Sequence, residues 1–140
     1  MMSDNYKTSW ISRGKDKVLG TEKPWGFERS WTGFNEIHGK ILFIKSKFKT
    51  SLKYHKLKSE TLHLISGKVM VTFGSENTLI NEGSSPYKKE EMNPGDTLLV
   101  QSGCPYRIEA IVDSQIVEIG NNLPDKPIRI EDDYGRNFYK

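Results

Sequence analysis

Short runs of β-branched and aromatic residues recur along most of the chain, separated by turn signals roughly every eight to twelve residues. The turn signals include Thr32-Gly33, Ser66-Gly67 and Pro94-Gly95-Asp96. Strands broken by turns at this spacing are typical of a β-sandwich or barrel. We expect strands, with ends accurate to about 2–4 residues, at 27–31, 36–47, 51–56, 61–65, 68–73, 78–81, 86–92, 97–100, 105–111 and 115–119.

The expected strand at 36–47 shows this alternation clearly. Leu42 and Ile44 lie on one face, and Lys45 and Lys47 lie on the other. Because successive strand residues point to opposite faces, this strand presents one side to a core and one to solvent. No stretch longer than about ten residues keeps a continuous helical apolar stripe. The pattern therefore predicts an all-β fold.

The length of 140 residues predicts one domain with one core, since a globule near this size buries roughly two-thirds of its unfolded surface. The hydrophobic share is only 35%, but 3 Trp, 6 Tyr and 6 Phe residues argue against disorder, because each buries a large area. Residues 1–21 lack the periodicity of a helix or strand. We expect an N-terminal arm at 1–21 and a barrel with a C-terminal tail at 22–140.

The single cysteine, Cys104, excludes an internal disulfide, and the first thirty residues hold no apolar stretch long enough for a signal peptide or membrane span. We therefore expect a cytoplasmic protein with no membrane partner. The net charge of +3 suits an anionic small molecule. No recognition motif accompanies the basic residues, so nucleic acid is not an expected partner.

Two segments carry the candidate chemistry, 51–67 and 93–107. In the first, His55 is followed by Glu60 and then by a Ser-Gly turn. In the second, a Pro-Gly-Asp turn leads to Tyr106. We expect the imidazole, the carboxylate and the phenol to converge in one sheet-lined cavity, where they would serve a metal ion or proton transfer.

With these segments in view, the chain resembles the cupin superfamily, and within it the C-terminal barrel of type II mannose-6-phosphate isomerases. The resemblance runs from Pro24-Trp25-Gly26, through the hairpin at 60–67 and Pro94-Gly95-Asp96, to the Glu-Asp-Asp-Tyr-Gly-Arg ending at 131–136. It covers nearly the whole chain beyond the arm, and the opening and the ending are its most specific parts. It implies a single-domain cupin double-stranded β-helix, or jelly-roll barrel, that acts on sugar phosphates.

The resemblance also implies a divalent metal such as zinc, held by a His-x-His pair, a glutamate and one more histidine. His55 and Glu60 match this set, but Leu57 stands at the second histidine and Tyr106 at the last. A catalytic zinc usually has three protein ligands, and Leu57 offers no lone pair. His55 and Glu60 therefore remain as the candidate metal ligands, and no cofactor follows from the residues alone.

Lys53 stands where the family has glutamine. If His55 points into the barrel, Lys53 and Leu57 should share its face, because alternate strand residues do. We expect the Lys53 ammonium to pair with Glu60 and so supply a cation without a metal, since a buried lysine is costly unless paired. Purely structural roles are the alternative, with His55 in the core, the Lys53 head in solvent and Tyr106 filling the barrel.

The resemblance gives Arg136 the place of the family's catalytic arginine, and a guanidinium holds a phosphate through forked hydrogen bonds. Lys49 belongs to the only dense basic run, which either lies on a solvated strand face or helps to hold a phosphate. The expected catalytic residues are His55 as base, Tyr106 as acid, and Arg136. The expected substrate-binding residues are Lys53, Glu60 and Lys49.

Three functions remain open, with a sugar phosphate or nucleotide sugar as the small-molecule partner. The first is aldose–ketose isomerisation of a sugar phosphate such as mannose 6-phosphate. The second is non-catalytic binding of a carbohydrate or sugar nucleotide, and the third is metal-free epimerisation or ketoisomerisation of a nucleotide sugar. The isomerase ranks first. A homodimer would cover the edges left by long strands such as 36–47.

Overall fold

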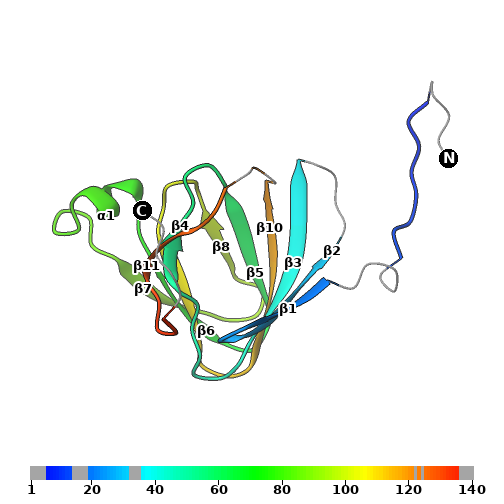
Figure 1. Cartoon of the computed structure of the whole chain (residues 1–140). Coiled ribbons are helices and arrows are strands. Elements are labelled where there is room, and N and C mark those ends of the chain that lie inside the picture. The colour runs from blue at the N-terminus through cyan, green and yellow to red at the C-terminus, as the bar shows by residue number, and fades with distance from the viewer. Residues whose placement is uncertain (1–5, 14–18, 32–35, 122, 124, 136–140) are drawn as a thin grey trace.

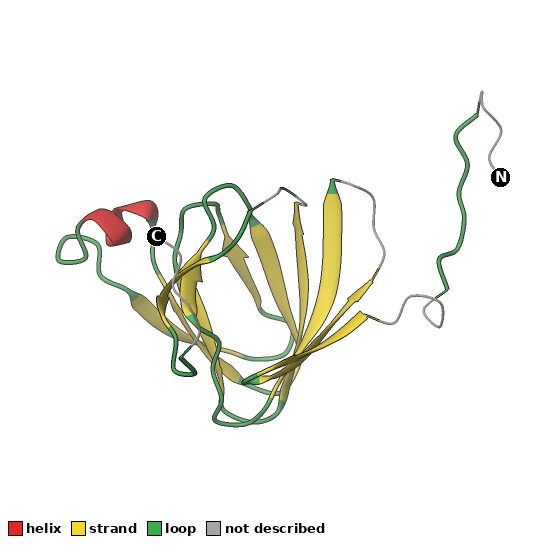
Figure 2. Cartoon of the chain, viewed as in Figure 1, coloured by secondary structure: helices red, strands yellow, loops and turns green. Residues whose placement is uncertain are grey.

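The computed structural model describes residues 6–13, 19–31, 36–121, 123 and 125–135. Among them the chain forms eleven strands and one five-residue helix (Figures 1 and 2). The elements in chain order are β1 (Leu19–Lys23), β2 (Gly26–Trp31), β3 (Ile37–Ile44), β4 (Leu52–Tyr54), β5 (Glu60–Ser66), β6 (Val69–Phe73), α1 (Glu76–Ile80), β7 (Lys88–Met92), β8 (Thr97–Val100), β9 (Tyr106–Ala110), β10 (Ser114–Asn121) and β11 (Ile128–Glu131).

The strands form two antiparallel sheets that face each other as a jelly-roll barrel (Figure 2). The first sheet has the order β1-β2-β3-β10-β5-β8, and the second has the order β11-β4-β9-β6-β7. The chain passes between the sheets repeatedly, so strands distant in sequence become neighbours. The expected all-β, single-domain barrel is confirmed. In the described part of the chain, no helix is long and apolar enough to span a membrane.

Glycine is required at the turn between β5 and β6. Gly67 has a φ of 96°, in the left-handed region that side chains other than glycine rarely adopt. A Cβ atom there would also lie 2.5 Å from the Asp113 carbonyl oxygen and 2.7 Å from the Ser114 Cα atom. The Ser-Gly signal therefore marks both a tight turn and a close approach of the β10 backbone.

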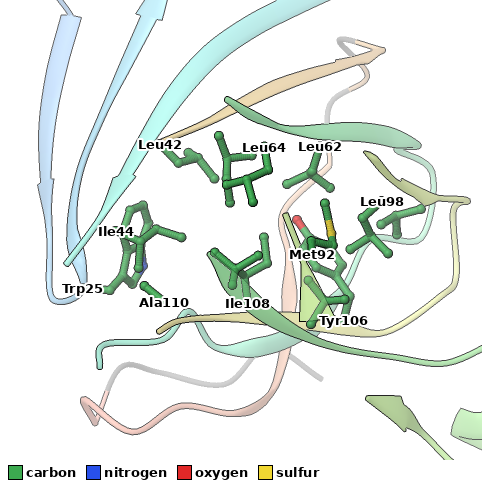
Figure 3. Packing of buried hydrophobic residues seen from close by; sticks show 14 residues of the cluster. Trp25, Leu42, Ile44, Leu62, Leu64, Met92, Leu98, Tyr106, Ile108 and Ala110 are labelled. Carbon is green, nitrogen blue, oxygen red and sulfur yellow. The ribbon is translucent and has the colours of Figure 1, made fainter. Parts of the chain in front are cut away.

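The core lies between the two sheets, where inward-facing side chains meet (Figure 3). Leu42, Ile116 and Leu64 form one row across the first sheet, because β10 pairs with both β3 and β5 in that register. Val71 and Ile108 approach from the second sheet, and all five are at most 4% exposed. Full burial of such a side chain contributes roughly 1.5–3 kcal/mol to folding.

Most expected strands are confirmed, but the predicted strand at 78–81 is wrong. Residues 78–80 belong to α1 and Asn81 caps its C-terminus, because Ser75 begins a helical turn in which its N–H donates to the Thr78 hydroxyl at 2.9 Å. Two strands were missed, β1 and β11. They are held by pairing with β2 and β4 and not by a strong apolar alternation of their own. The boundary expected between residues 21 and 22 falls inside β1.

Candidate functional site

The inner face of the first sheet changes from apolar to charged along its strands. On β3 the inward side chains run from Ile44 and Leu42 to Lys40, and on β10 they run from Ile116 to Glu118. Lys40 and Glu118 lie opposite each other in the β3–β10 register. The strand alternation that builds the core therefore delivers charged groups to one end of the barrel.

A cavity of about 290 Å³ occupies this end of the barrel, between the two sheets. Glu60 and Glu118 line it from the first sheet, and Lys53 and Tyr106 line it from β4 and β9 of the second. Lys53 and Tyr106 are paired in the β4–β9 register. The cavity thus combines charges from strands that are far apart in the sequence.

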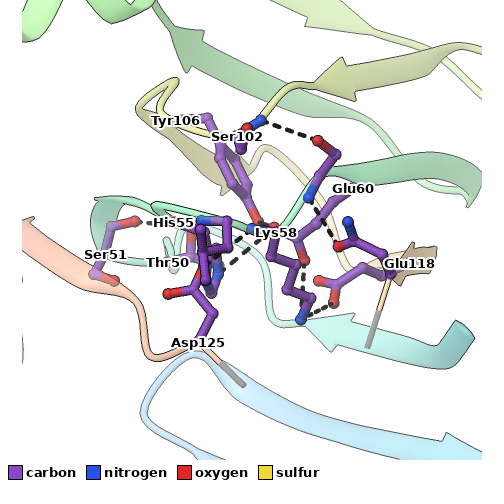
Figure 4. Close-up of polar contacts among 12 residues, drawn as sticks. Thr50, Ser51, His55, Lys58, Glu60, Ser102, Tyr106, Glu118 and Asp125 are labelled. Carbon is purple, nitrogen blue, oxygen red and sulfur yellow. Dashed lines mark hydrogen bonds and ion pairs between the residues drawn. The ribbon is translucent and has the colours of Figure 1, made fainter. Parts of the chain in front are cut away.

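Glu60 is the centre of the polar contacts in the cavity (Figure 4). The Tyr106 hydroxyl donates a hydrogen bond of 3.0 Å to Glu60 Oε1, and His55 Nε2 lies 3.8 Å from the same oxygen. All three residues are buried. The structure therefore brings together the imidazole, carboxylate and phenol that the sequence singled out. Their catalytic roles stay predictions.

His55 follows β4 and is favoured in its neutral form. Burial lowers the pKa of His55, and the nearby Lys58 and Lys53 charges lower it further against the opposing effect of Glu60. Its Nδ1 atom lies 3.7 Å from the Asp125 carboxylate. A neutral imidazole can accept a proton at neutral pH, so His55 has the protonation state that a general base needs.

The Asp125 carboxylate also orders the loop that carries His55. Its Oδ2 atom accepts hydrogen bonds from the backbone N–H groups of Leu57 at 2.8 Å and Lys58 at 3.0 Å. Although burial opposes ionisation, these two bonds and the His55 charge lower the pKa of Asp125. Asp125 therefore stays ionised and holds the loop against the barrel.

Glu60 and Glu118 share one proton at neutral pH. Burial raises the pKa of Glu60, but a hydrogen bond from Glu118 and the charges of Lys53 and Lys58 outweigh it and hold that pKa at about 2. Burial and the negative charge of Glu60 raise the pKa of Glu118 to about 8, against the effect of Lys40 and Lys58. Glu60 is therefore the carboxylate, and Glu118 carries the proton.

Lys58 forms an ion pair with Glu60: its Nζ atom lies 3.7 Å from Glu60 Oε2 and 3.9 Å from Glu118 Oε2. Lys53, for which we expected this pair, has its Nζ atom 4.9 Å from the centre of the Tyr106 ring. Its charge still lowers the pKa of Glu60. Lys53 thus acts on Glu60 electrostatically and lies over the Tyr106 ring as a cation–π partner.

Tyr106 remains a proton donor at neutral pH. It is 2% exposed, and burial followed by the charge of Glu60 raises the pKa of Tyr106 well above its usual value. The neutral phenol keeps the hydrogen bond to Glu60 intact. Tyr106 therefore fixes the orientation of the carboxylate.

Two residues named from the sequence lie outside the cavity. The expectation that Leu57 shares the inward face is wrong: Leu57 is 55% exposed, because β4 ends at Tyr54 and the alternation ends with it. Among the described residues, Lys49 forms a 3.0 Å ion pair with Asp133 and does not line the cavity. Arg136 lies outside the described residues.

Sequence reasoning missed Glu118 and Lys40, and it recognised Lys58 only as a member of the dense basic run. Glu118 lies two residues after the inward-facing Ile116, and Lys40 lies two before Leu42, so strand alternation places both inside the barrel. Lys58 lies in a loop, where that rule gives no direction. The signal that could have found Glu118 and Lys40 is a charged residue at the next inward-facing position of a strand whose other inward-facing residues are apolar.

The donor set at the positions that the family resemblance implies does not fit a divalent metal. Of those positions only His55 and Glu60 carry the expected ligands, and Leu57 points to solvent. The Lys53 and Lys58 ammonium groups already act on Glu60, and a metal ion beside them would be repelled. We therefore derive no chemical step through a metal at these positions.

Comparisons with known proteins identify the fold. No family model matches the chain. No curated protein matches it in sequence. Among solved structures, KdgF from Halomonas sp. is similar with a TM-score of 0.64 and 12% identity over 84% of this chain and 96% of KdgF.

Two further structures are similar over a part of their length. Oxalate decarboxylase from Bacillus subtilis has a TM-score of 0.68 and 18% identity over 84% of this chain and 31% of its own. The capsular polysaccharide assembling protein CapF from Staphylococcus aureus has a TM-score of 0.68 and 13% identity over 83% of this chain and 32% of its own. This chain thus spans about a third of these two relatives. At such identities the likeness concerns the fold, and the fold is the cupin double-stranded β-helix.

Proposed function

We propose that the barrel cavity binds a small phosphorylated sugar and catalyses aldose–ketose isomerisation on it, as in mannose-6-phosphate isomerases but without a metal. The observation that carries the proposal is the convergence of neutral His55, ionised Glu60 and half-buried lysines in one cavity. This reaction needs a base, a cation for the developing oxyanion and a holder for the phosphate. The cavity offers side chains for each of these tasks.

The charge of the cavity favours an anionic ligand. Its described lining contains five cationic side chains and four carboxyl groups, and one of these carboxyls, Glu118, holds a proton at neutral pH. The cationic side chains are Lys23, Lys40, Lys53, Lys58 and Arg129. Lysines bind phosphate as point charges, and the surplus of positive charge attracts it.

The size of the cavity favours a monosaccharide phosphate over a nucleotide sugar. Its volume of about 290 Å³ is at the low end of the range for ligand pockets, roughly 300–1,000 Å³. A nucleotide would have to extend beyond the described cavity. The similar fold of CapF, a capsular polysaccharide assembling protein, supports a carbohydrate ligand.

The proposed mechanism moves one proton between adjacent carbons. His55 removes the proton from the carbon that bears the hydroxyl group, which gives an enediolate, and returns it to the neighbouring carbon. Lys53 and Lys58 stabilise the negative oxygen of the enediolate. Glu118 donates its proton to the carbonyl oxygen of the sugar, and the Glu60–Glu118 pair takes a proton from the hydroxyl group on the adjacent carbon. The carbonyl group thus becomes a hydroxyl group, and the hydroxyl group becomes a carbonyl group.

Interconversion of mannose 6-phosphate and fructose 6-phosphate, followed with a chelator present, tests this proposal. We expect turnover by the wild type and a loss of about 10²–10⁴-fold in His55→Ala, the usual contribution of a general base. The control is His63→Ala, since His63 is exposed on β5 and faces away from the cavity. Full activity of His55→Ala, or an inactive wild type even with divalent metal supplied, would contradict isomerisation.

Binding without turnover is the second candidate, and the contacts of Glu60 favour it. The Glu60 carboxylate already receives a hydrogen bond from Tyr106 and forms an ion pair with Lys58, so its own charge is satisfied without a reaction. A binding module would show a rise in melting temperature with sugar phosphates but no turnover, because a ligand of the folded state stabilises it by mass action. Replacing the sugar phosphate with a nucleotide sugar in the same measurement separates the two ligand classes.

A further inference from the structure

Glu60 also belongs to a second cluster, which His38 and Glu118 complete. One donor atom from each of the three lies within 4.8 Å of the other two. The residues come from β3, β5 and β10, and both His38 and Glu60 lie opposite Gly120 of β10, which separates them in the sheet. This cluster shares only Glu60 with the metal positions that the family resemblance implies.

Gly120 is what allows His38 to reach toward Glu60 across β10. A Cβ atom on Gly120 would lie 2.9 Å from His38 Nε2, closer than real Cβ contacts allow. The imidazole therefore lies over the strand where no side chain intervenes. The geometry of three neighbouring strands, with a glycine in the middle one, holds the three donors together.

Two donor atoms in this cluster lack hydrogen bonds. Within the described residues, the buried atoms His38 Nε2 and Glu118 Oε2 have no hydrogen-bond partner. Glu118 is 4% exposed, and its Oε2 atom has only long ion-pair contacts, with Lys40 Nζ at 3.7 Å and Lys58 Nζ at 3.9 Å. One imidazole and two carboxyl groups form a donor set that suits borderline divalent ions such as zinc and cobalt.

The Lys58 side chain lies among these donors. Its Nζ atom is 3.7 Å from Glu60 Oε2 and 3.9 Å from Glu118 Oε2. Its Cε atom is 3.3 Å from the same Gly120 Cβ position that approaches His38. The ammonium thus lies beside the position that a metal ion would take, and two cations separated by about 4 Å repel each other strongly at low dielectric.

We propose that Lys58 is a tethered cation that fills a three-ligand metal site formed by His38, Glu60 and Glu118, and that removal of its ammonium opens this site to a divalent ion. The ammonium neutralises the single negative charge of the Glu60–Glu118 pair, which a metal ion would otherwise neutralise. The wild type therefore binds no divalent ion at this cluster. This inference concerns ion binding and holds whether or not the cavity turns over a sugar.

Titration with Co²⁺ tests the proposal, because bound Co²⁺ is visible in the absorption spectrum. We expect Lys58→Met to bind one Co²⁺ at least about 100-fold more tightly than the wild type, since one repelling charge has been removed. Lys56→Met is the matched control, because Lys56 is exposed in the same loop, and it should behave as the wild type does. Adding Glu118→Gln or His38→Gln to Lys58→Met should abolish the binding.

Two results of the titration would overturn the proposal. Equal affinity for Co²⁺ in the wild type and in Lys58→Met would show that the Lys58 ammonium does not exclude a divalent ion. Binding that survives the loss of both His38 and Glu118 would place the ion elsewhere. If Lys58→Met does not fold alone, refolding with Co²⁺ decides the matter: recovery of the fold supports the site, and no recovery contradicts it.

Discussion

The same strands form both ends of the barrel, but one end is apolar and the other is charged. On β10, Ile116 belongs to the apolar end and Glu118 to the charged end, only two residues away. On β5, Leu64 likewise belongs to the apolar end and Glu60 to the charged end. Apolar burial stabilises the fold, whereas buried ion pairs add little, because desolvation offsets their attraction. Sheet geometry therefore sets where a side chain points, and residue type decides between stability and chemistry.

The largest loss of stability should come from the apolar end. Leu64→Ala removes a fully buried side chain, and we expect the free energy of unfolding to fall by about 2–5 kcal/mol. Ile65→Ala is the control, since Ile65 is the next residue on β5, points outward and is 45% exposed. Urea denaturation of both variants measures the difference. Equal losses in the two would contradict the assignment of the inner and outer faces.

Gly120→Ala should give the next largest effect, at the boundary between β10 and the charged end. The new methyl group would lie 2.9 Å from the Ser59 carbonyl oxygen and from His38 Nε2, so the neighbouring chain must move. We expect a loss of about 1–3 kcal/mol, as for other overpacked sites. Gly20→Ala is the control, because no described atom lies within 4 Å of the position its methyl group would take. Urea denaturation in which both variants resembled the wild type would contradict the close packing at Gly120.

Titration of Glu118 in the charged end should make the free energy of unfolding depend on pH. The pKa of Glu118 is about 8 in the folded chain and 4.5 as its ordinary value. A raised folded pKa contributes stability that is fully present below pH 4.5 and is lost as the pH rises through 8. Relative to Glu118→Gln, the wild type should therefore become steadily less stable as the pH rises over this window.

Urea denaturation of both proteins at several pH values between 4.5 and 8 checks this prediction. The Gln side chain keeps the size of Glu118 and removes its titration. Parallel stability profiles would mean that Glu118 does not hold a proton in the folded chain. A wild type that gained stability with rising pH would reverse the assignment within the Glu60–Glu118 pair.

Leu57→Ala should have the smallest effect. Leu57 is 55% exposed, and its backbone N–H, which binds Asp125, is retained in the variant. We expect the free energy of unfolding to change by no more than about 0.5 kcal/mol, as for most surface substitutions. A thermal melt measures this. A loss of about 2 kcal/mol or more, the range of core truncations, would place Leu57 inside the barrel after all.

The alternation of residue types predicted the barrel and the inward face of β3 because burial imposes a period of two on every half-buried strand. The same rule could have found Glu118, which is in step with Ile116. It gave no guide to Lys58, which follows the end of β4 and is directed by loop contacts with Asp125. Nor did it find β1 or β11, whose pairing with distant strands depends on the assembled fold.

The most direct test is an NMR titration of the ¹⁵N-labelled protein with mannose 6-phosphate in the presence of a chelator. If the charged end is the ligand site, the amide signals of Lys53, Glu60 and Tyr106 should shift on binding, while those of Leu64 and Ile116 in the apolar end stay nearly unchanged. Shifts concentrated at the apolar end, or no shifts at millimolar ligand, would contradict a sugar-phosphate site in this cavity.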